Sequence, residues 1–380
     1  MLSFVATAGL PIHLASLLDS LSPYLTTILA TVVVLGVLIF VHELGHFLLA
    51  KFFKVRVEVF SLGFPPKLIS KQVGETDYRI SVVPLGGYVK LLGENPNDEV
   101  PPELIPYSFL HRPLYQRAAI VLAGPAFNFF FAVISLFLVF AFSGLPYVPT
   151  EIGRVIADSP AAQAGLQAGD SIVAVDGAPV KRWEELSQII RGRGGKPLDL
   201  TVKRGDKDLN FTLTPEKKEG LNIFGQKVEA FQIGVASSER LATEELGPVE
   251  AFGEGVVYSL RIAALTLQSM YKLIAREISV DTLGGPIMIA QVAGKQAEMG
   301  FVHLIHFMAV LSVNLTLLNL LPVPVLDGGH LVFLFLEAVR GKPVEIKHRE
   351  MAQALGMVLI LTLMVLVFYH DIMRLFTPRQ

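Results

Sequence analysis

The chain has no cysteine among its 380 residues. Disulfide bonds and thiolate-bound metals are therefore excluded, and any metal must be held by His, Asp or Glu side chains. Charged residues are also scarce, at 17%, whereas hydrophobic residues make up 52%. Because the mean hydropathy is positive as well, the composition predicts a membrane protein rather than a water-soluble globule.

Positive charge is sparse both in the chain as a whole and in its first twenty residues. The formal net charge is −2 and there is no long basic run, so no binding of nucleic acid is expected. The first twenty residues contain neither Lys nor Arg, unlike the charged start of a cleaved signal peptide. The first hydrophobic helix is therefore expected to serve as an uncleaved insertion signal.

Long apolar runs indicate four membrane spans. A hydrocarbon core of about 30 Å requires about 20 apolar residues in a helix. Runs of this kind occupy residues 24–50, 117–143, 301–321 and 351–370. The predicted fold class is an α-helical polytopic membrane protein with four transmembrane helices.

A hydrophilic section, residues 146–245, separates the second and third spans. Its segments "SIVAVDG", "LDLTVKR" and "LNFTLTP" alternate apolar and polar residues between turn residues, which predicts an inserted soluble domain of mixed α/β type. Residues 246–276 have apolar side chains at helical spacing but carry Arg261, Lys272 and Arg276. This pattern favours an amphipathic helix on the membrane surface over a fifth span.

The loop charges predict the orientation. The loops between spans one and two and between spans three and four are rich in positive charge: Lys51, Lys54, Arg56, Lys67, Lys71, Arg79, Lys90 and Arg112 in one, and Arg340, Lys342, Lys347 and Arg349 in the other. Positively charged loops stay in the cytoplasm. Both termini and the inserted domain are thus expected on the periplasmic or extracytoplasmic side of a bacterial inner membrane, although Arg374 and Arg379 run against this rule.

The motif "HELGH" places ionisable residues inside the first span. His42 and His46 lie four residues apart, so a helix stacks them on one face, where they suit one Zn²⁺. Glu43 would project beside the metal and could move a proton between water and a leaving amine. Ionisable side chains are costly in a membrane unless they find partners, so a metal site is favoured over a coincidental pair of core histidines.

A catalytic zinc usually takes a third protein ligand. The third span ends in "NLLPVPVLDGGH", which offers Asp327, with His330 close by and His303 and His306 at the opposite end. Asp327 is ranked first, because the latter two would have to reach across the bilayer. Pro322 and its neighbours break the helix at membrane depth, where open backbone is tolerated only against protein or a watery cavity.

Three motifs resemble the site-2 protease family of intramembrane zinc metalloproteases, in its bacterial RseP-like branch. They are "HELGH", "AGPAFNFF" (residues 123–130) and "NLLPVPVLDGGH" (residues 319–330). The resemblance implies that His42, His46 and Asp327 bind zinc and that Glu43 is the general base. It also implies that Asn319 and Pro322 contact substrate.

Asn128 falls on a further motif position of the family, in the second span. It is expected either to lie beside the substrate or to make an interhelical hydrogen bond.

The segment "DYRISVVPLGGYVKLLGE" predicts a β-hairpin around Gly86 and Gly87. It is either a small cytoplasmic hairpin or, as the family resemblance implies, a β element folded back into the membrane. In the second case a strand edge would hold an unwound substrate segment.

The inserted domain resembles a single PDZ domain. "ADSPAAQAGLQAGDSIVAVDGAPV" predicts a small-residue helix at Gly165–Asp170 followed by a strand and a turn at Asp176 and Gly177. "FQIGV", with Ile233, Gly234 and Val235, is the expected peptide-binding edge. Such a domain binds a C-terminal peptide or excludes bulky substrates by size.

The resulting organisation has four parts: residues 1–143 with two spans and the hairpin, 144–245 with the PDZ-like domain, 246–300 at the membrane surface, and 301–380 with two spans. "GPIMIAQVAGKQAEMG" (residues 285–300) resembles the family's segment between the amphipathic region and the third span; its Gly-Pro and small residues are otherwise typical of a linker. The predicted activity is zinc-dependent cleavage of single-pass membrane proteins, already trimmed by another protease, such as anti-sigma factors or remnant signal peptides. A zinc transporter and an inactive PDZ scaffold are the alternatives.

Overall fold

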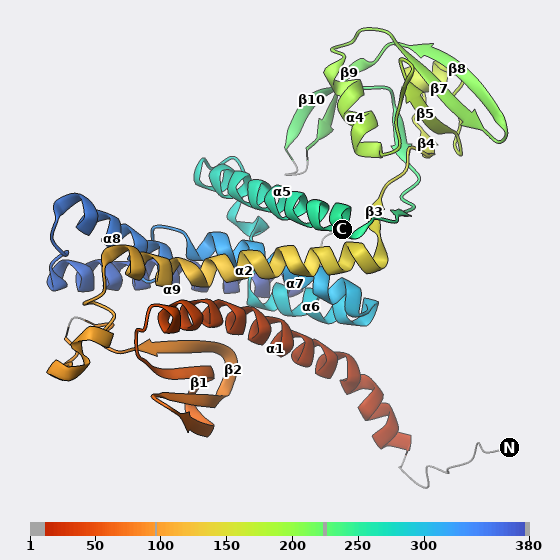
Figure 1. Cartoon of the computed structure of the whole chain (residues 1–380). Helices are drawn as coiled ribbons and strands as arrows, with labels where there is room; N and C mark the ends of the chain where they lie inside the picture. The colour runs from red at the N-terminus through yellow and green to blue at the C-terminus, as the bar shows by residue number, and fades with distance from the viewer. Residues whose placement is uncertain (1–11, 96, 223–225, 377–380) are drawn as a thin grey trace. The chain divides into compact units, whose positions relative to one another are not determined.

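The structure is a computed structural model that describes residues 12–95, 97–222 and 226–376 (Figure 1). The chain forms two compact units. One consists of residues 1–139 and 252–380, and the other of residues 140–251. The second unit covers the range of the predicted insertion.

The first unit is mainly helical. Its helices are α1 (Ile12–Phe52), α2 (Leu114–Ser143), α5 (Pro248–Ile274), α6 (Pro286–Met299), α7 (Phe301–Asn319), α8 (Asp327–Arg340) and α9 (Ile346–Phe376). It also contains strands β1 (Val57–Val73) and β2 (Thr76–Leu91), and short 3₁₀ helices at Pro102–Tyr107 and Val280–Thr282.

Within the described ranges, four helices are long and apolar enough to cross a membrane: Pro23–Phe52 of α1, and α2, α7 and α9. In hydrocarbon each backbone N–H needs a hydrogen-bond acceptor within the protein, and a helix supplies these acceptors from its own backbone. These helices match the four predicted spans. Helix α5 is not among them; one side of it packs on α2 and α7, where Thr266 donates a hydrogen bond to Asn314 (2.7 Å).

Helix α1 is the central packing element of this unit. The middle of this helix, with Val34 and Leu38, packs against Ala293 of α6 and Met308 of α7. All four side chains are buried. Near its C-terminal end, Ala50 joins a second cluster that includes Leu91 of β2 and Ile120 of α2. The last turns of α1 are therefore held between α2 and the hairpin.

The predicted linker at residues 285–300 is wrong, because α6 occupies it. Pro286 takes the first helical position, where a missing N–H costs nothing. The carboxylate of Asp371, a residue of α9 that is 2% exposed, accepts hydrogen bonds of 3.0–3.1 Å from the N–H groups of Gly285, Ile287 and Met288. A buried carboxylate thus caps α6 and fastens α9 to it.

The hairpin differs from the prediction in its turn. β1 and β2 are joined at Gly74 and Glu75, and Gly86 and Gly87 lie inside β2. Residues 59–62 of β1 pair with two parts of β2, residues 77–80 and residues 87–90. The long strands must therefore bend to bring both parts of β2 beside the same segment of β1. Lys51 at the end of α1 pairs with Glu75 (2.5 Å), which ties the turn to the helix.

The second unit is built of short antiparallel strands and two helices. Its strands are β3 (Leu145–Tyr147), β4 (Ile152–Val155), β5 (Ser171–Val175), β6 (Ala178–Pro179), β7 (Leu198–Arg204), β8 (Lys207–Leu213), β9 (Glu216–Leu221), β10 (Lys227–Gln232), β11 (Val235–Ser237) and β12 (Ala242–Glu244). The helices are α3 (Pro160–Ala164) and α4 (Trp183–Gly192). One sheet has the order β6-β5-β7-β8, and the pairs β4–β11, β9–β10 and β3–β12 complete the unit.

The small-residue helix of this unit lies earlier than predicted. Ser159 caps α3 through Ala162 N–H, and Gly165 ends the helix in the left-handed conformation (φ 86°). The predicted range Gly165–Asp170 is instead the turn that leads into β5. There Asp170, which is 1% exposed, bonds Arg204 (2.6 Å), and this guanidinium lowers the pKa of the Asp170 carboxyl.

Replacing the buried cap of α6 should destabilise the first unit. Asp371→Ala leaves three N–H groups without their charged acceptor, so we expect the free energy of unfolding to fall by about 3 kcal/mol. Titration with SDS in mixed micelles measures it. Thr362→Ala on the exposed side of the same helix is the control and should change the value by less than about 0.5 kcal/mol. Equal effects of the two variants would contradict the capping role.

Candidate metal centre

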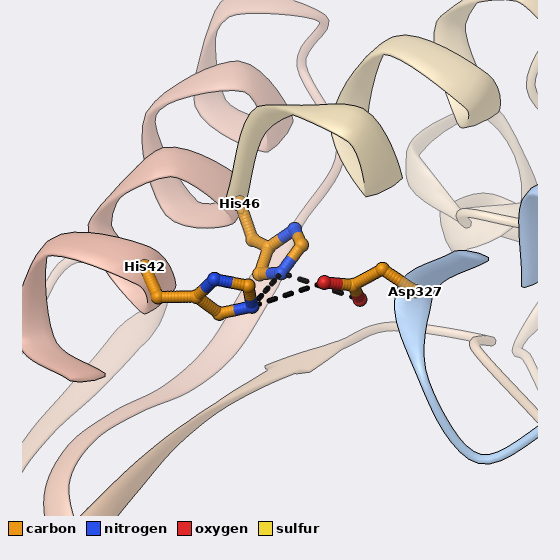
Figure 2. A group of neighbouring side chains, drawn as sticks. All are labelled: His42, His46 and Asp327. Carbon is orange, nitrogen blue, oxygen red and sulfur yellow. Dashed lines mark hydrogen bonds and ion pairs between the residues drawn. The ribbon is translucent and has the colours of Figure 1, made fainter. Parts of the chain in front are cut away.

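His42, His46 and Asp327 point toward one another from two helices (Figure 2). The Nε2 atoms of the two histidines, one turn apart on α1, are separated by 3.2 Å. Asp327 Oδ2 lies 3.0 Å from His42 Nε2, and Asp327 Oδ1 lies 3.6 Å from His46 Nε2. One donor atom from each residue fits within 4.8 Å of the others, so the group could hold a single metal ion.

The chemistry of these donors fits a divalent cation. Two imidazole nitrogens that face each other at 3.2 Å repel if both carry lone pairs, and each also faces a carboxylate oxygen of Asp327. A cation between the three atoms would satisfy all of them. Two imidazoles and a carboxylate form a ligand set that zinc uses in catalytic sites, with a fourth position left open.

Helix α2 fixes the two imidazole rings from behind. The carbonyl of Ile120 lies 2.8 Å from His46 Nδ1, and the fully buried amide of Asn128 lies 3.2 Å from His42 Nδ1. Both contacts leave the Nε2 atoms facing Asp327. The interhelical hydrogen bond considered for Asn128 is therefore present, and its partner belongs to the metal group.

Close approach of α1 and α2 depends on glycine. A Cβ atom on Gly124 would collide with the rings of His42 and His46, and one on Gly45 would collide with the carbonyl of Ala123. Since side chains larger than hydrogen do not fit, these two positions determine how near α2 comes to the imidazoles.

Asp327 does not lie on the third span, as predicted, but begins the separate helix α8. Helix α7 ends at Asn319, and Pro322 belongs to the turn that follows. Gly328 and Gly329 pack so closely on the backbone of residues 320–324 that a Cβ would clash. The structure therefore locks the start of α8 against the broken end of α7.

A buried ion pair holds the other end of α8. Arg117 of α2 is 7% exposed and donates two hydrogen bonds to Glu337, of 2.5 and 3.1 Å. Bidentate guanidinium–carboxylate pairs combine charge with fixed geometry. Helix α2 thus contacts both helices that carry the metal group.

A cavity of about 430 Å³ opens at the metal group. Glu43 lines it, and its Oε2 accepts a hydrogen bond from the N–H of Val89 in β2 (3.2 Å). A Cβ on Gly87 would meet the Glu43 side chain at 3.4 Å. Glu94 lies farther along the wall, and burial raises the pKa of its carboxyl.

The other predicted residues are distributed unequally around this centre. Asn319 Nδ2 lies 3.5 Å from His42 Nδ1, whereas Pro322 is exposed and does not line the cavity. His330 lines the cavity but is outside the metal group, and His306 contacts the ring of Tyr258 at the opposite end of α7.

Several site residues have no counterpart in the prediction. Gly124 lies within the quoted motif "AGPAFNFF" and was not singled out, although a glycine beside a metal motif is a usable signal. Arg117, Glu337 and the carbonyl of Ile120 act through partners far away in sequence, which local patterns do not reveal.

A separate groove of about 290 Å³ lies in the second unit between α4 and residues 228–235. Ile233, Gly234 and Val235 line it, opposite Leu186 and Ile190. Gly234 has a positive φ of 84°, and a Cβ there would collide with Ser159.

Adding one methyl group behind the imidazoles should disrupt the metal group. Gly124→Ala forces both rings to move, so we expect loss of most bound zinc after purification and dialysis. Gly253→Ala, in a helix position with open space around it, is the control and should keep its metal. Zinc content by atomic absorption checks this; a fully loaded Gly124→Ala protein would show that the rings are not confined.

Residues 30–363 match the model of Peptidase family M50. A Rhizobium meliloti strain 1021 protein named "Putative zinc metalloprotease R01501" is 36% identical over 95% of this chain and 99% of its own length. A Campylobacter jejuni protein named "Putative zinc metalloprotease Cj1068" is 37% identical over 93% of this chain and 95% of its own length. The regulator of sigma-E protease RseP of Salmonella typhimurium is 33% identical over 91% and 98%.

One solved structure also aligns with part of the chain. The PDZ domain of the SdrC-like protein from Listeria monocytogenes has 26% identity and a TM-score of 0.19, over 24% of this chain and 88% of its own.

The family match includes two of the candidate membrane helices and the metal group completely and overlaps the other two helices, and the relatives align over nearly their whole lengths. The chain belongs to Peptidase family M50, the site-2 protease family of zinc metallopeptidases.

Proposed function

We propose that the chain cleaves peptide bonds inside the transmembrane segments of single-pass membrane proteins, with His42, His46 and Asp327 as zinc ligands and Glu43 as general base. The observation that carries the proposal is the convergence of Asp327 on His42 and His46, which lie with Glu43 inside a helix apolar enough to span the membrane. Such groups are costly at this depth and are retained for function.

Bound zinc would act as a Lewis acid that polarises the scissile carbonyl and activates water. Glu43 takes the proton of the attacking water on its carboxylate and then donates it to the leaving amide nitrogen. The Val89 N–H holds Oε2 of this carboxylate until a substrate strand takes its place. Asn319, beside His42, is positioned to donate its amide N–H to the substrate carbonyl.

A transmembrane helix must unwind before hydrolysis, because its peptide bonds are engaged in internal hydrogen bonds. In β2, residues 87–91 pair with β1 on one edge, and on the other edge Val89 and Leu91 donate to Glu43 and Glu94. We propose that the unwound substrate pairs along this second edge. Gly86 and Gly87 serve this role by close approach rather than as a turn.

The proposed setting is the bacterial inner membrane, with both termini and the PDZ-like domain on the periplasmic or extracytoplasmic side. The substrates are membrane proteins already trimmed by another protease. The name of the Salmonella relative refers to regulation of sigma E, which supports anti-sigma factors as one substrate class beside remnant signal peptides.

Removal of the base should separate catalysis from metal binding. We expect Glu43→Gln to retain about one zinc per chain and to cleave a trimmed single-pass substrate in detergent roughly 10²–10⁴-fold more slowly. Glu350→Gln, an exposed carboxylate that lines the same cavity, is the matched control and should cleave normally.

The same experiment decides against the alternatives. A wild-type protein that binds zinc but cuts no trimmed single-pass helix would remove the protease function and favour transport. Unchanged cleavage by Glu43→Gln would remove the assignment of the general base.

We further propose that the groove of the second unit binds an apolar C-terminal peptide. Its walls include Leu186, Ile190 and Val235, and the backbone around Gly234 could receive a terminal carboxylate, as backbone nests do. A substrate trimmed by another protease would present such a terminus.

Filling this groove should abolish peptide binding. In the full-length protein, Ser187→Trp places an indole among the lining residues, and we expect the affinity for a labelled peptide with a C-terminal Val, measured by fluorescence anisotropy, to fall at least about tenfold. Gln188→Trp, the exposed neighbour, should bind as wild type does. If wild type binds no such peptide, the groove does not capture termini and size exclusion is favoured.

A further inference from the structure

His42 and His46 both expose Nε2 to the metal group, but their Nδ1 atoms face different partners. His46 Nδ1 lies 2.8 Å from the carbonyl oxygen of Ile120. A carbonyl only accepts hydrogen bonds, so this ring carries a proton on Nδ1, and in its neutral form it keeps the lone pair on Nε2. His46 is thereby fixed in the form that binds a metal through Nε2.

His42 needs the same arrangement. If its Nε2 lone pair is directed at a metal, its Nδ1 carries the proton and requires an acceptor. Two amides are near this atom: Asn128 at 3.2 Å and Asn319 at 3.5 Å. Both are oriented with their NH₂ groups toward Nδ1, and an NH₂ group cannot accept a hydrogen bond.

Asn128 can supply the missing acceptor. Its side chain is completely buried, and its Oδ1 has no hydrogen-bond donor. The oxygen and nitrogen of an amide have nearly the same shape, and their assignment follows from their partners. Rotation of the Asn128 amide by half a turn joins the buried oxygen that lacks a donor to the ring N–H that lacks an acceptor.

We infer that Asn128 is a positioning residue for zinc: its Oδ1 accepts the Nδ1–H of His42, holds that ring in the metal-binding tautomer, and leaves the Asn319 amide free for substrate. The inference rests on the proposed zinc site and extends it to a residue of α2 that touches neither the metal nor the substrate. Asn128 then does for His42 what the Ile120 carbonyl does for His46.

A second hydrogen bond of Asn128 provides a control that distinguishes the positioning of His42 from the packing of helices. The backbone carbonyl of Asn128 accepts a hydrogen bond from the Ser312 hydroxyl (2.8 Å), which joins α2 to α7 without touching the histidines. Ser312→Ala removes a buried polar contact at the same residue and leaves the His42 contact intact. It is therefore the matched control.

The test is the zinc dissociation constant of full-length protein in detergent, measured by competition with a chelator. Asn128→Leu removes the acceptor and should weaken zinc binding by about 10- to 100-fold. Asn128→Asp offers only acceptors and should remain within about threefold of wild type or bind more tightly. Ser312→Ala should match wild type.

Two results would overturn the inference. Wild-type affinity in Asn128→Leu would show that His42 needs no acceptor there, and equal weakening in Asn128→Asp and Asn128→Leu would show that the amide donates instead. If Asn128→Leu does not fold, the affinity of Asn128→Asp alone decides between the two orientations. Failure of wild type to bind zinc at all would instead overturn the proposed function.

Discussion

The carboxylate of Asp327 meets two imidazoles of α1, a helix whose residues 23–52 are apolar enough to cross a membrane. Burial of such groups is expensive unless they share partners, and the oxygens of Asp327 lie 3.0 and 3.6 Å from the Nε2 atoms of His42 and His46. A shared cation removes this cost only if all three donor atoms are held within a few ångströms of one another. The surrounding helices therefore have to meet a tight geometric requirement, and their packing shows how they do so.

Helix α2 meets most of that requirement from one face. Arg117, Ile120, Gly124 and Asn128 recur at intervals of three to four residues, the spacing of one helical face. Along this face Arg117 anchors α8 by an ion pair. The Ile120 carbonyl lies beside Nδ1 of His46, and the Asn128 amide lies beside Nδ1 of His42. Gly124 leaves room for both rings. No residue of this face belongs to the metal group, yet Ile120, Gly124 and Asn128 lie against its imidazoles and Arg117 anchors the helix that begins with Asp327.

The sequence predicted the spans and "HELGH" because their signals are local: twenty apolar residues fill a bilayer, and a separation of four residues stacks two side chains in any helix. The structure places Asp327 in one group with His42 and His46. It lies on helix α8, however, and not on the third span, where it was predicted. The prolines after Asn319 were seen to break the helix, whereas the restart at Asp327 depends on Gly328 and Gly329 packing on that break.

Other errors have the same cause. Gly86 and Gly87 resemble a hairpin turn, and only the fold shows that these positions lie against Phe64 and against Ser61 and Glu43. The helix at Pro286 looked like a linker because its cap, Asp371, comes from the other end of the chain. Short-range patterns contain no information about partners that are brought together by tertiary packing.

The contact between Glu43 and Val89 links two parts of the proposed mechanism. The Val89 N–H points from the edge of β2 to the Glu43 carboxylate, and the Leu91 N–H, two residues on along the same edge, points to Glu94. A substrate segment that pairs along this edge offers carbonyl oxygens to the same N–H groups and so competes with both carboxylates. Pairing would release Glu43 from the strand at the moment when an extended peptide lies beside it. In the proposed mechanism, a single backbone hydrogen bond therefore couples the edge that would align the substrate to the carboxylate that would act on water.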